Sequence, residues 1–144
     1  MSANLLHALY DGRDPQSLAY RFEGLPARTT AEARRRVGQM AASLKAHGVV
    51  KGDRISFQLD KGEEVLLLAH ACLQLGGVLH PLNTAYTEAE VAGLVTDAEP
   101  RLLVSSLADA ARLRAALPNV AVATLGPGLS GSLGLLAAGS APLE

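Results

Sequence analysis

Apolar residues recur with the period of an α-helix in the segment after Thr29. They are Ala33, Val37, Met40 or Ala41, and Leu44. Thr29 and Glu32 have the spacing of a capping box, in which the hydroxyl and the carboxylate each accept a hydrogen bond from an otherwise unpaired backbone amide. Since Gly48 is typical of a helix end, we predict a helix between Thr29 and Gly48.

The rest of the chain alternates short apolar runs, typical of strands, with segments whose apolar residues favour helices. The predicted strands are 18–22, 55–59, 78–82, 102–104 and 120–125, and further helices are predicted near 5–11, 63–75, 87–95 and 109–117. Strands that alternate with helices over short connections favour a mostly parallel, doubly wound α/β sheet with helices on both faces. We place this α/β layer in residues 1–125, and the apolar strands indicate burial on both sides of the sheet.

The composition changes after residue 125. Glycine, serine, alanine and proline dominate residues 126–144, which predicts a linker or weakly ordered tail. Residues 126–131 also spell G-x-G-x-x-G, the spacing that lets a dinucleotide-binding loop approach a pyrophosphate. Pro127 removes one amide donor from that loop, and Gly134 weakens the helix that should follow. We therefore favour the linker and keep a nucleotide-binding module as a minor hypothesis.

Composition narrows the classes of function. The chain has 144 residues, enough for one domain with one core. Its 13 basic and 14 acidic residues lack the excess of positive charge that a nucleic-acid-binding surface needs, so no nucleic-acid partner is expected. No apolar run is long enough to cross a membrane. The first residues have no basic start and no small-residue cleavage site, so we expect no signal peptide and a cytoplasmic protein.

No residue of the chain is predicted to be catalytic, to bind a cofactor or to ligate a metal. Cys72 lies in the most apolar predicted helix, and we interpret it as a core residue. The four histidines lack a metal-ligand spacing with a third ligand. Glu63 and Glu64 open a helix, where the helix dipole stabilises acidic residues. The run Arg34–Arg36 could bind an anion, but at helical spacing its side chains fan around the helix, so we favour a solvated face.

The segment LQLGGVLHPLN (Leu73–Asn83) resembles a core motif of the adenylate-forming superfamily, which contains acyl-CoA synthetases, luciferases and the adenylation domains of peptide synthetases. In that superfamily a helix ends in a small-residue turn and leads into a buried strand that ends in Pro-Leu-Asn or Pro-Leu-Asp. The continuation PLNTAYTEAEV (Pro81–Val91) and the stretch DAEPRLLV (Asp97–Val104) are similar to malonyl-CoA synthetases in particular. KGDRISFQL (Lys51–Leu59) matches the preceding strand of the family, and the resemblance covers nearly the whole chain.

The resemblance implies a fold and a reaction. The fold is the N-terminal part of the large domain of an acyl-CoA synthetase. In the reaction, a carboxylate attacks the α-phosphate of ATP to give an acyl-adenylate and pyrophosphate, and the thiol of coenzyme A then displaces AMP. A full-length member is therefore expected to use ATP, Mg²⁺ and coenzyme A. The family's phosphate loop, magnesium-binding glutamate and catalytic lysine correspond to positions after residue 144, so this chain is expected to be scaffold and to hold no cofactor.

Two hypotheses about function stay open. In the first, the chain is the N-terminal portion of a malonyl-CoA-synthetase-like acid–CoA ligase, its partner is the remainder of that synthetase, and the isolated chain is inactive. In the second, it is a stand-alone, non-catalytic paralogue that binds a partner or itself, because a truncated sheet exposes an edge and an apolar face.

Thr30 and Ala33 stand where the family usually has larger residues in its first conserved helix, which is expected to loosen packing there.

Overall fold

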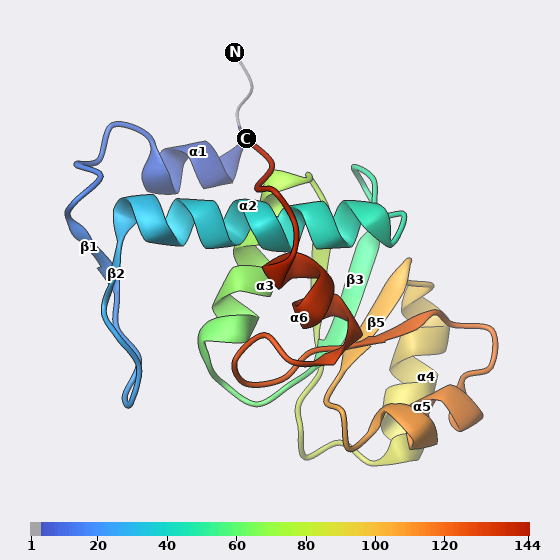
Figure 1. Ribbon diagram of the computed structural model, residues 1–144. Helices are drawn as coiled ribbons and strands as arrows, with labels where there is room; N and C mark the ends of the chain where they lie inside the picture. Colours follow the sequence, from blue (N-terminus) through green and yellow to red (C-terminus); the bar gives the residue numbers. More distant parts are fainter. Residues whose placement is uncertain (1–3) are drawn as a thin grey trace.

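The alternation of strands and helices produces a four-stranded parallel sheet with helices on both faces, as predicted (Figure 1). The computed structural model describes residues 4–144, so the first three residues of the segment judged for a signal peptide lie outside the described part. The sheet contains β3 (Arg54–Gln58), β4 (Val78–Pro81), β5 (Leu102–Ser105) and β6 (Val122–Thr124), in the order β4-β3-β5-β6. A separate antiparallel pair consists of β1 (Leu18–Tyr20) and β2 (Arg28–Thr29).

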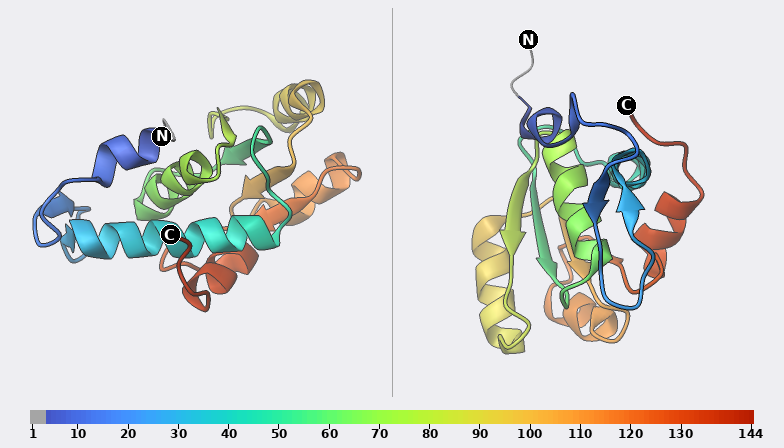
Figure 2. Two further views of the ribbon diagram at one scale, coloured as in Figure 1. Left: turned by 90° about the horizontal axis from the view of Figure 1, so that it is seen from above. Right: turned by 90° about the vertical axis from the view of Figure 1, so that its left-hand side faces the viewer.

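Six helices surround these strands in the described part of the chain. They are α1 (Leu5–Tyr10), α2 (Thr30–Ala46), α3 (Glu63–Gln74), α4 (Glu88–Ala98), α5 (Ala110–Ala116) and α6 (Gly131–Ala138). Helices α2, α3 and α6 cover one face of the sheet, and α4 and α5 cover the other (Figure 2). Val104 of β5 lies in the larger core with α2, and its neighbour Leu103 lies in the smaller core with α4 and α5. Because side chains alternate across a strand, β5 contributes to both cores.

The local sequence rules hold at two helix starts. The Thr29 hydroxyl accepts a hydrogen bond from the Glu32 amide at 3.2 Å, and the Glu32 carboxylate accepts one from the Thr29 amide at 2.8 Å. Thr87 and Glu90 form the same reciprocal pair at the start of α4. Pro81 lies in the edge strand β4, as expected for a residue without an amide hydrogen.

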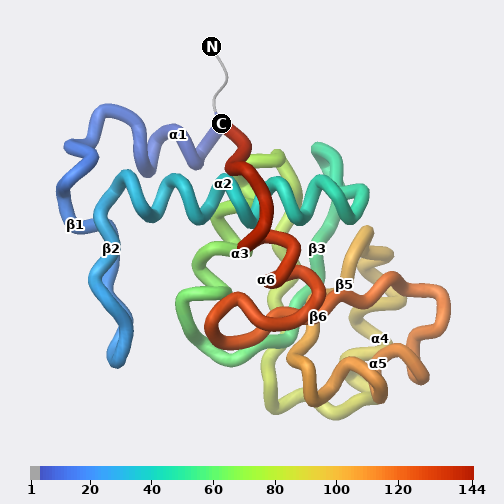
Figure 3. The backbone as a smooth tube through the Cα atoms, in the orientation of Figure 1, coloured from blue at the N-terminus to red at the C-terminus, as the bar shows by residue number. Residues whose placement is uncertain are grey.

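The C-terminal segment differs from the predicted linker. Residues Gly131–Ala138 form α6, which lies along α2 with Leu133 and Ala137 fully buried (Figures 1 and 3). Gly134 permits close packing, since an added Cβ would lie 2.5 Å from the backbone carbonyl carbon of Leu129. The expectation of a weakly ordered tail is therefore wrong for α6, because its stability comes from tertiary packing and not from local propensity.

The strand predicted over residues 18–22 is shorter in the structure and has a partner that the sequence did not indicate. β1 ends at Tyr20 and pairs with the two-residue strand β2. No alternation pattern exists in a strand of two residues, so the periodicity gave no signal for β2.

We expect Leu133→Ala to destabilise the chain by about 3 kcal/mol, because it leaves a cavity between α6 and α2. Leu135→Ala is the matched control, since Leu135 is 69% exposed on the same helix and its truncation should cost little. Urea unfolding followed by circular dichroism measures both changes. Equal stabilities of the two variants would contradict the packed position of α6.

Candidate functional site

The carboxyl ends of the parallel strands meet at one edge of the sheet, where open α/β sheets usually bind ligands. The chain passes from β3 to β4 on one side and then crosses back to β5 on the other, so the direction of winding switches between β3 and β5. A small cavity of about 190 Å³ lies at this point. Its polar lining residues are Gln58, Asp60, Thr84, Ser106 and Asp109.

Several of these polar groups already have partners within the chain. The Gln58 amide donates to the Asn83 carbonyl at 2.9 Å. The Ser106 hydroxyl donates to Asp109 at 3.0 Å, and Arg112 donates to the other carboxylate oxygen at 3.0 Å. Hydrogen bonds from Arg112 and Ser106 hold the pKa of Asp109 below its usual range. The crevice is thus a polar edge of the sheet in which the Ser106 hydroxyl and the Asp109 carboxylate are bonded within the chain.

The glycine-rich loop after β6 lies between a strand and a helix, the context of a dinucleotide-binding loop, although we expected a linker in place of the helix. Several of its amides, however, are occupied. The Gly128 amide donates to the Glu64 carboxylate at 2.9 Å. The Ser130 amide donates to the Gly126 carbonyl at 3.2 Å, and the Ser132 amide donates to the Thr124 hydroxyl at 2.8 Å. Because these donors are satisfied within the chain, this loop has few groups left for a pyrophosphate. The geometry therefore argues against the nucleotide-binding hypothesis.

A buried carboxylate, Glu63, stands at the centre of a charged cluster. Its Oε1 accepts hydrogen bonds from the Tyr20 hydroxyl at 2.7 Å and the Arg28 guanidinium at 3.0 Å, and it forms an ion pair with Arg36 at 3.0 Å. Burial opposes ionisation of Glu63, yet the hydrogen bonds from Tyr20 and Arg28 and the charge of Arg36 hold its pKa below the usual range. Burial and the hydrogen bond to Glu63 raise the pKa of Tyr20.

The Glu63 cluster corrects one sequence interpretation and extends another. The solvated face expected for Arg34–Arg36 is wrong for Arg36, which turns inward, while Arg35 is exposed. Glu63 does open α3, but it also joins β1, β2 and α2 to that helix. These contacts hold β1, β2, α2 and α3 together, and they occupy the Tyr20 hydroxyl and Oε1 of Glu63.

Two further groups resemble catalytic parts but lack access. The Ser56 hydroxyl lies 2.7 Å from Nδ1 of His80, a pair that the parallel register of β3 and β4 brings together and that their separation in sequence did not suggest. Ser56 is fully buried, so no substrate reaches it. Cys72 is also fully buried, as predicted, and burial raises the pKa of its thiol to about 11.

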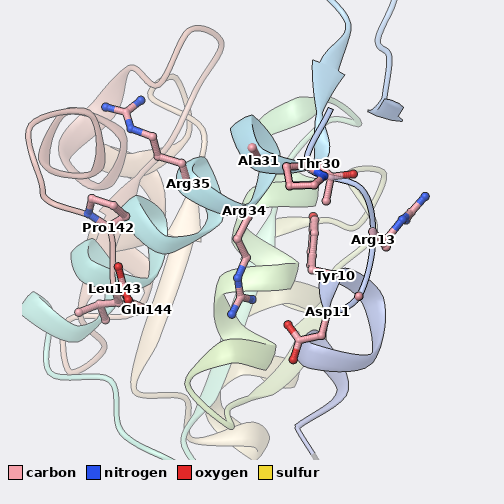
Figure 4. Close-up of a pocket in the computed structure, with 12 residues that line it drawn as sticks. Tyr10, Asp11, Arg13, Thr30, Ala31, Arg34, Arg35, Pro142, Leu143 and Glu144 are labelled. Atoms are coloured by element: carbon pink, nitrogen blue, oxygen red, sulfur yellow. The ribbon is translucent and has the colours of Figure 1, made fainter. Parts of the chain in front are cut away.

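A larger cavity of about 560 Å³ lies between the end of α1, the first half of α2 and the last residues of the chain (Figure 4). Arg13, Arg34 and Arg35 line it, together with Asp11 and Glu144. The Arg34 guanidinium lies 5.9 Å from the centre of the Tyr10 ring, a cation–π arrangement. The Tyr10 hydroxyl in turn lies 2.9 Å from Nδ1 of His70 on α3.

Residues 4–144 do not provide a metal site or a membrane span. No group of three or more histidine, cysteine, aspartate or glutamate side chains in this range is arranged to hold a metal ion. The Mg²⁺ expected for a full-length synthetase therefore does not fit the residues described here. Among the helices of the same range, none combines the length and hydropathy that a bilayer crossing requires.

Glu63→Gln should lower the free energy of unfolding by about 3 kcal/mol, because it leaves two guanidinium groups beside a neutral partner. Glu23→Gln, at an exposed position, is the control and should change little. Since the folded pKa of Glu63 is lowered, its contribution is present above about pH 4.5 and is lost as the pH falls through the folded value. Urea unfolding from pH 7 to pH 3 tests this, and a constant difference between the wild type and Glu63→Gln would contradict it.

Comparison with known proteins places most of the chain in one enzyme family. A sequence model of the family described as AMP-binding enzyme matches residues 11–132. Acetyl-coenzyme A synthetase of Methanothrix thermoacetophila is 32% identical over 94 residues, which is 62% of this chain and 14% of that protein. The chain spans between 2% and 14% of the length of three curated relatives that it matches.

Solved structures extend the similarity to the complete fold. The crystal structure of apo MatB from Rhodopseudomonas palustris is 39% identical, with a TM-score of 0.91, and the match covers 98% of this chain and 29% of that chain. A benzoate CoA ligase from Burkholderia xenovorans LB400 is 23% identical with a TM-score of 0.76, covering 96% of this chain and 28% of its own, a likeness of fold alone. The described chain is therefore similar to under a third of each of these longer proteins.

Proposed function

This chain belongs to the AMP-binding enzyme family, and from that premise we propose that it is the N-terminal portion of an acid–CoA ligase of the malonyl-CoA synthetase kind. The observation that carries the proposal is the 39% identity, over 98% of the chain, to MatB, a malonyl-CoA synthetase. The likeness to the benzoate ligase, at 23% identity, supports only the fold. Malonate is therefore the acid substrate that we favour for the whole enzyme.

The role of this portion is structural. Its parallel sheet and its two apolar cores form one layer of the large domain, and the groups that act on ATP and coenzyme A belong to the remainder of the enzyme. Acyl-adenylate formation depends on charged groups held around the reacting phosphate and carboxylate. In residues 4–144 the charged groups with short contacts pair with one another, as in the Glu63 cluster, or lie at the surface. We place the reaction in the cytoplasm.

A stand-alone binding module remains the second candidate. The observation that favours it is that 28 hydrophobic residues of the described chain are already buried without any partner, so the chain has the core of an independent folding unit. Its exposed apolar residues, including Leu135 and Leu107, then offer a surface for self-association.

The isolated chain should not form malonyl-adenylate. We expect malonate-dependent exchange of pyrophosphate into ATP to stay at the level of a reaction without protein, because the groups that bind the triphosphate are supplied elsewhere. Full-length MatB from Rhodopseudomonas palustris serves as the active control. Exchange that rises in proportion to the concentration of the purified chain would contradict the proposal.

A chimera gives the positive test. In it, this chain replaces the matched 29% of MatB, and we expect malonate-dependent formation of a coenzyme A thioester. A second chimera carrying Leu133→Ala should melt at a lower temperature while keeping the same choice of acid, since Leu133 is in the scaffold. Because the rest of the chimera is MatB, its activity tests whether this chain serves as the scaffold, and not which acid the enzyme that contains this chain activates. A folded chimera without any ligase activity would favour the binding module.

A further inference from the structure

The last residues of the described chain form a strap across α2, defined here as the C-terminal strap (residues 139–144) (Figure 3). The Leu143 amide donates to the Gly38 carbonyl at 3.0 Å, and the Leu143 carbonyl accepts from the Gln74 side chain at 3.0 Å. The Gln39 side chain donates to the Ser140 carbonyl at 3.1 Å. Contacts with both α2 and α3 hold the strap in one path.

Gly38 shows that α2 is shaped to receive this strap. A Cβ at Gly38 would lie 2.5 Å from the Leu143 carbonyl oxygen and 2.9 Å from the Pro142 side chain. Any larger residue would push the strap away from α2, and glycine in a helix interior otherwise costs about 1 kcal/mol relative to alanine. The close approach of the strap gives this glycine a physical reason.

The strap forms one wall of the 560 Å³ cavity. Of the charged residues that line this cavity, Asp11 has an ion-pair partner and the three arginines have none in the described part of the chain. Arg13, Arg34 and Arg35 take part in none of the ion pairs found within residues 4–144. Figure 4 shows the Arg34 side chain extending between Asp11 on one side and Glu144 on the other, while Arg13 and Arg35 point outward. One terminal nitrogen of Arg34, Nη1, is buried and has no hydrogen-bond acceptor. A buried donor without an acceptor is unfavourable. Asp11 lines the same cavity but pairs with His7, and no ion pair joins Arg34 to Asp11 or Glu144.

We propose that this cavity is a groove that seats an acidic segment of polypeptide, namely the part of a full-length synthetase that follows residue 144. The inference rests on the proposed function, because it takes the longer chain from the relatives, of which MatB is covered over only 29%. Leu143 and Glu144 line the groove, so a continuing chain starts at its rim. A carboxylate on that segment accepts hydrogen bonds from the planar guanidinium of Arg34, which suits two-point binding of carboxylates.

The walls of the groove favour a peptide over a free small anion. Asp11 and Glu144 repel any anion that enters, but Pro15, Ala31 and Pro142 offer apolar surface that a polypeptide can cover and a small anion cannot. A segment joined to the strap also has a high effective concentration at the groove, so each carboxylate needs only a modest affinity. The covalent link to the strap and the mixed charged and apolar lining of the groove both favour a peptide as its occupant.

The test compares two extended forms of this chain. Each carries an extension of about ten residues after Glu144, long enough to reach across the groove, with aspartate or asparagine at alternate positions between glycine and serine. We expect the aspartate form to melt about 3 °C higher at low ionic strength, the size expected for ion pairs of this kind. The difference should disappear in concentrated salt. The ¹⁵N resonance of Arg34 Nε should shift in the aspartate form alone.

Two variants locate the effect. Arg34→Gln should abolish the difference in melting temperature between the extended forms, and Arg34→Lys should retain part of it. Arg21→Gln removes an arginine that does not line the groove and should leave the difference intact. The NMR signal of Arg34 in the extended wild-type chain provides a readout even if a variant folds poorly.

Equal melting temperatures together with an unshifted Arg34 signal would overturn the proposal. It would also be overturned if inorganic phosphate or malonate, added free at millimolar concentration, shifted the Arg34 signal as strongly as the aspartate extension. In that case the groove binds small anions. Neither measurement uses ligase activity, so an inactive chimera would refute the proposed function without deciding the groove, and the reverse also holds.

Discussion

The packing of α2 against the sheet and against α3 and α6 is the interaction on which the rest of this structure depends. Five of its residues are fully buried in the larger core: Ala33, Val37, Met40, Ala41 and Leu44. Their small or flexible side chains let neighbouring helices approach closely, and burial of this apolar face is the main favourable term in folding. Other positions of α2 hold α3, α6 and the C-terminal strap. Arg36 forms an ion pair with Glu63 of α3, and Ser43 donates to the Leu133 carbonyl of α6 at 2.8 Å. The Gly38 carbonyl accepts a hydrogen bond from the strap.

In this structure, buried polar groups hold neighbouring elements together and do not form a reactive site. A buried carboxylate beside two arginines often signals catalysis, but at Glu63 the Tyr20 hydroxyl and the guanidinium groups complete its contacts. The same holds for Ser56 and His80, whose hydrogen bond satisfies two groups between adjacent strands. Buried polar groups that bond to one another in this way are expected in the proposed scaffold portion of a ligase. They hold the strands and helices in place, while the reacting residues are supplied by the rest of the enzyme.

The fold and most of the helix boundaries could be predicted from the chain itself. Capping boxes at Thr29 and Thr87 involve residues three positions apart, so their chemistry is written locally. Alternation in β3 and the apolar character of α3 likewise depend on neighbours in sequence. The family resemblance came from the order of such segments, and the match of residues 11–132 to the AMP-binding enzyme family agrees with it.

The sequence by itself therefore determined the α/β class, the family and the elements other than β2 and α6, since each follows from local periodicity or from short motifs. Only the tertiary structure decided the fate of residues whose partners lie far along the chain. Gly134 weakens an isolated helix, yet α6 forms because Leu133 is buried in the core and its carbonyl accepts a hydrogen bond from Ser43, 90 positions away. The consecutive arginines at positions 34–36 take different roles only when Glu63 and Tyr10 lie beside them. Arg34 and Tyr10 are 24 positions apart, Arg36 and Glu63 are 27 apart, and Gln39 and Ser140 are 101 apart. A local sequence pattern cannot predict such contacts, because they stabilise the chain only after folding has brought the two segments together.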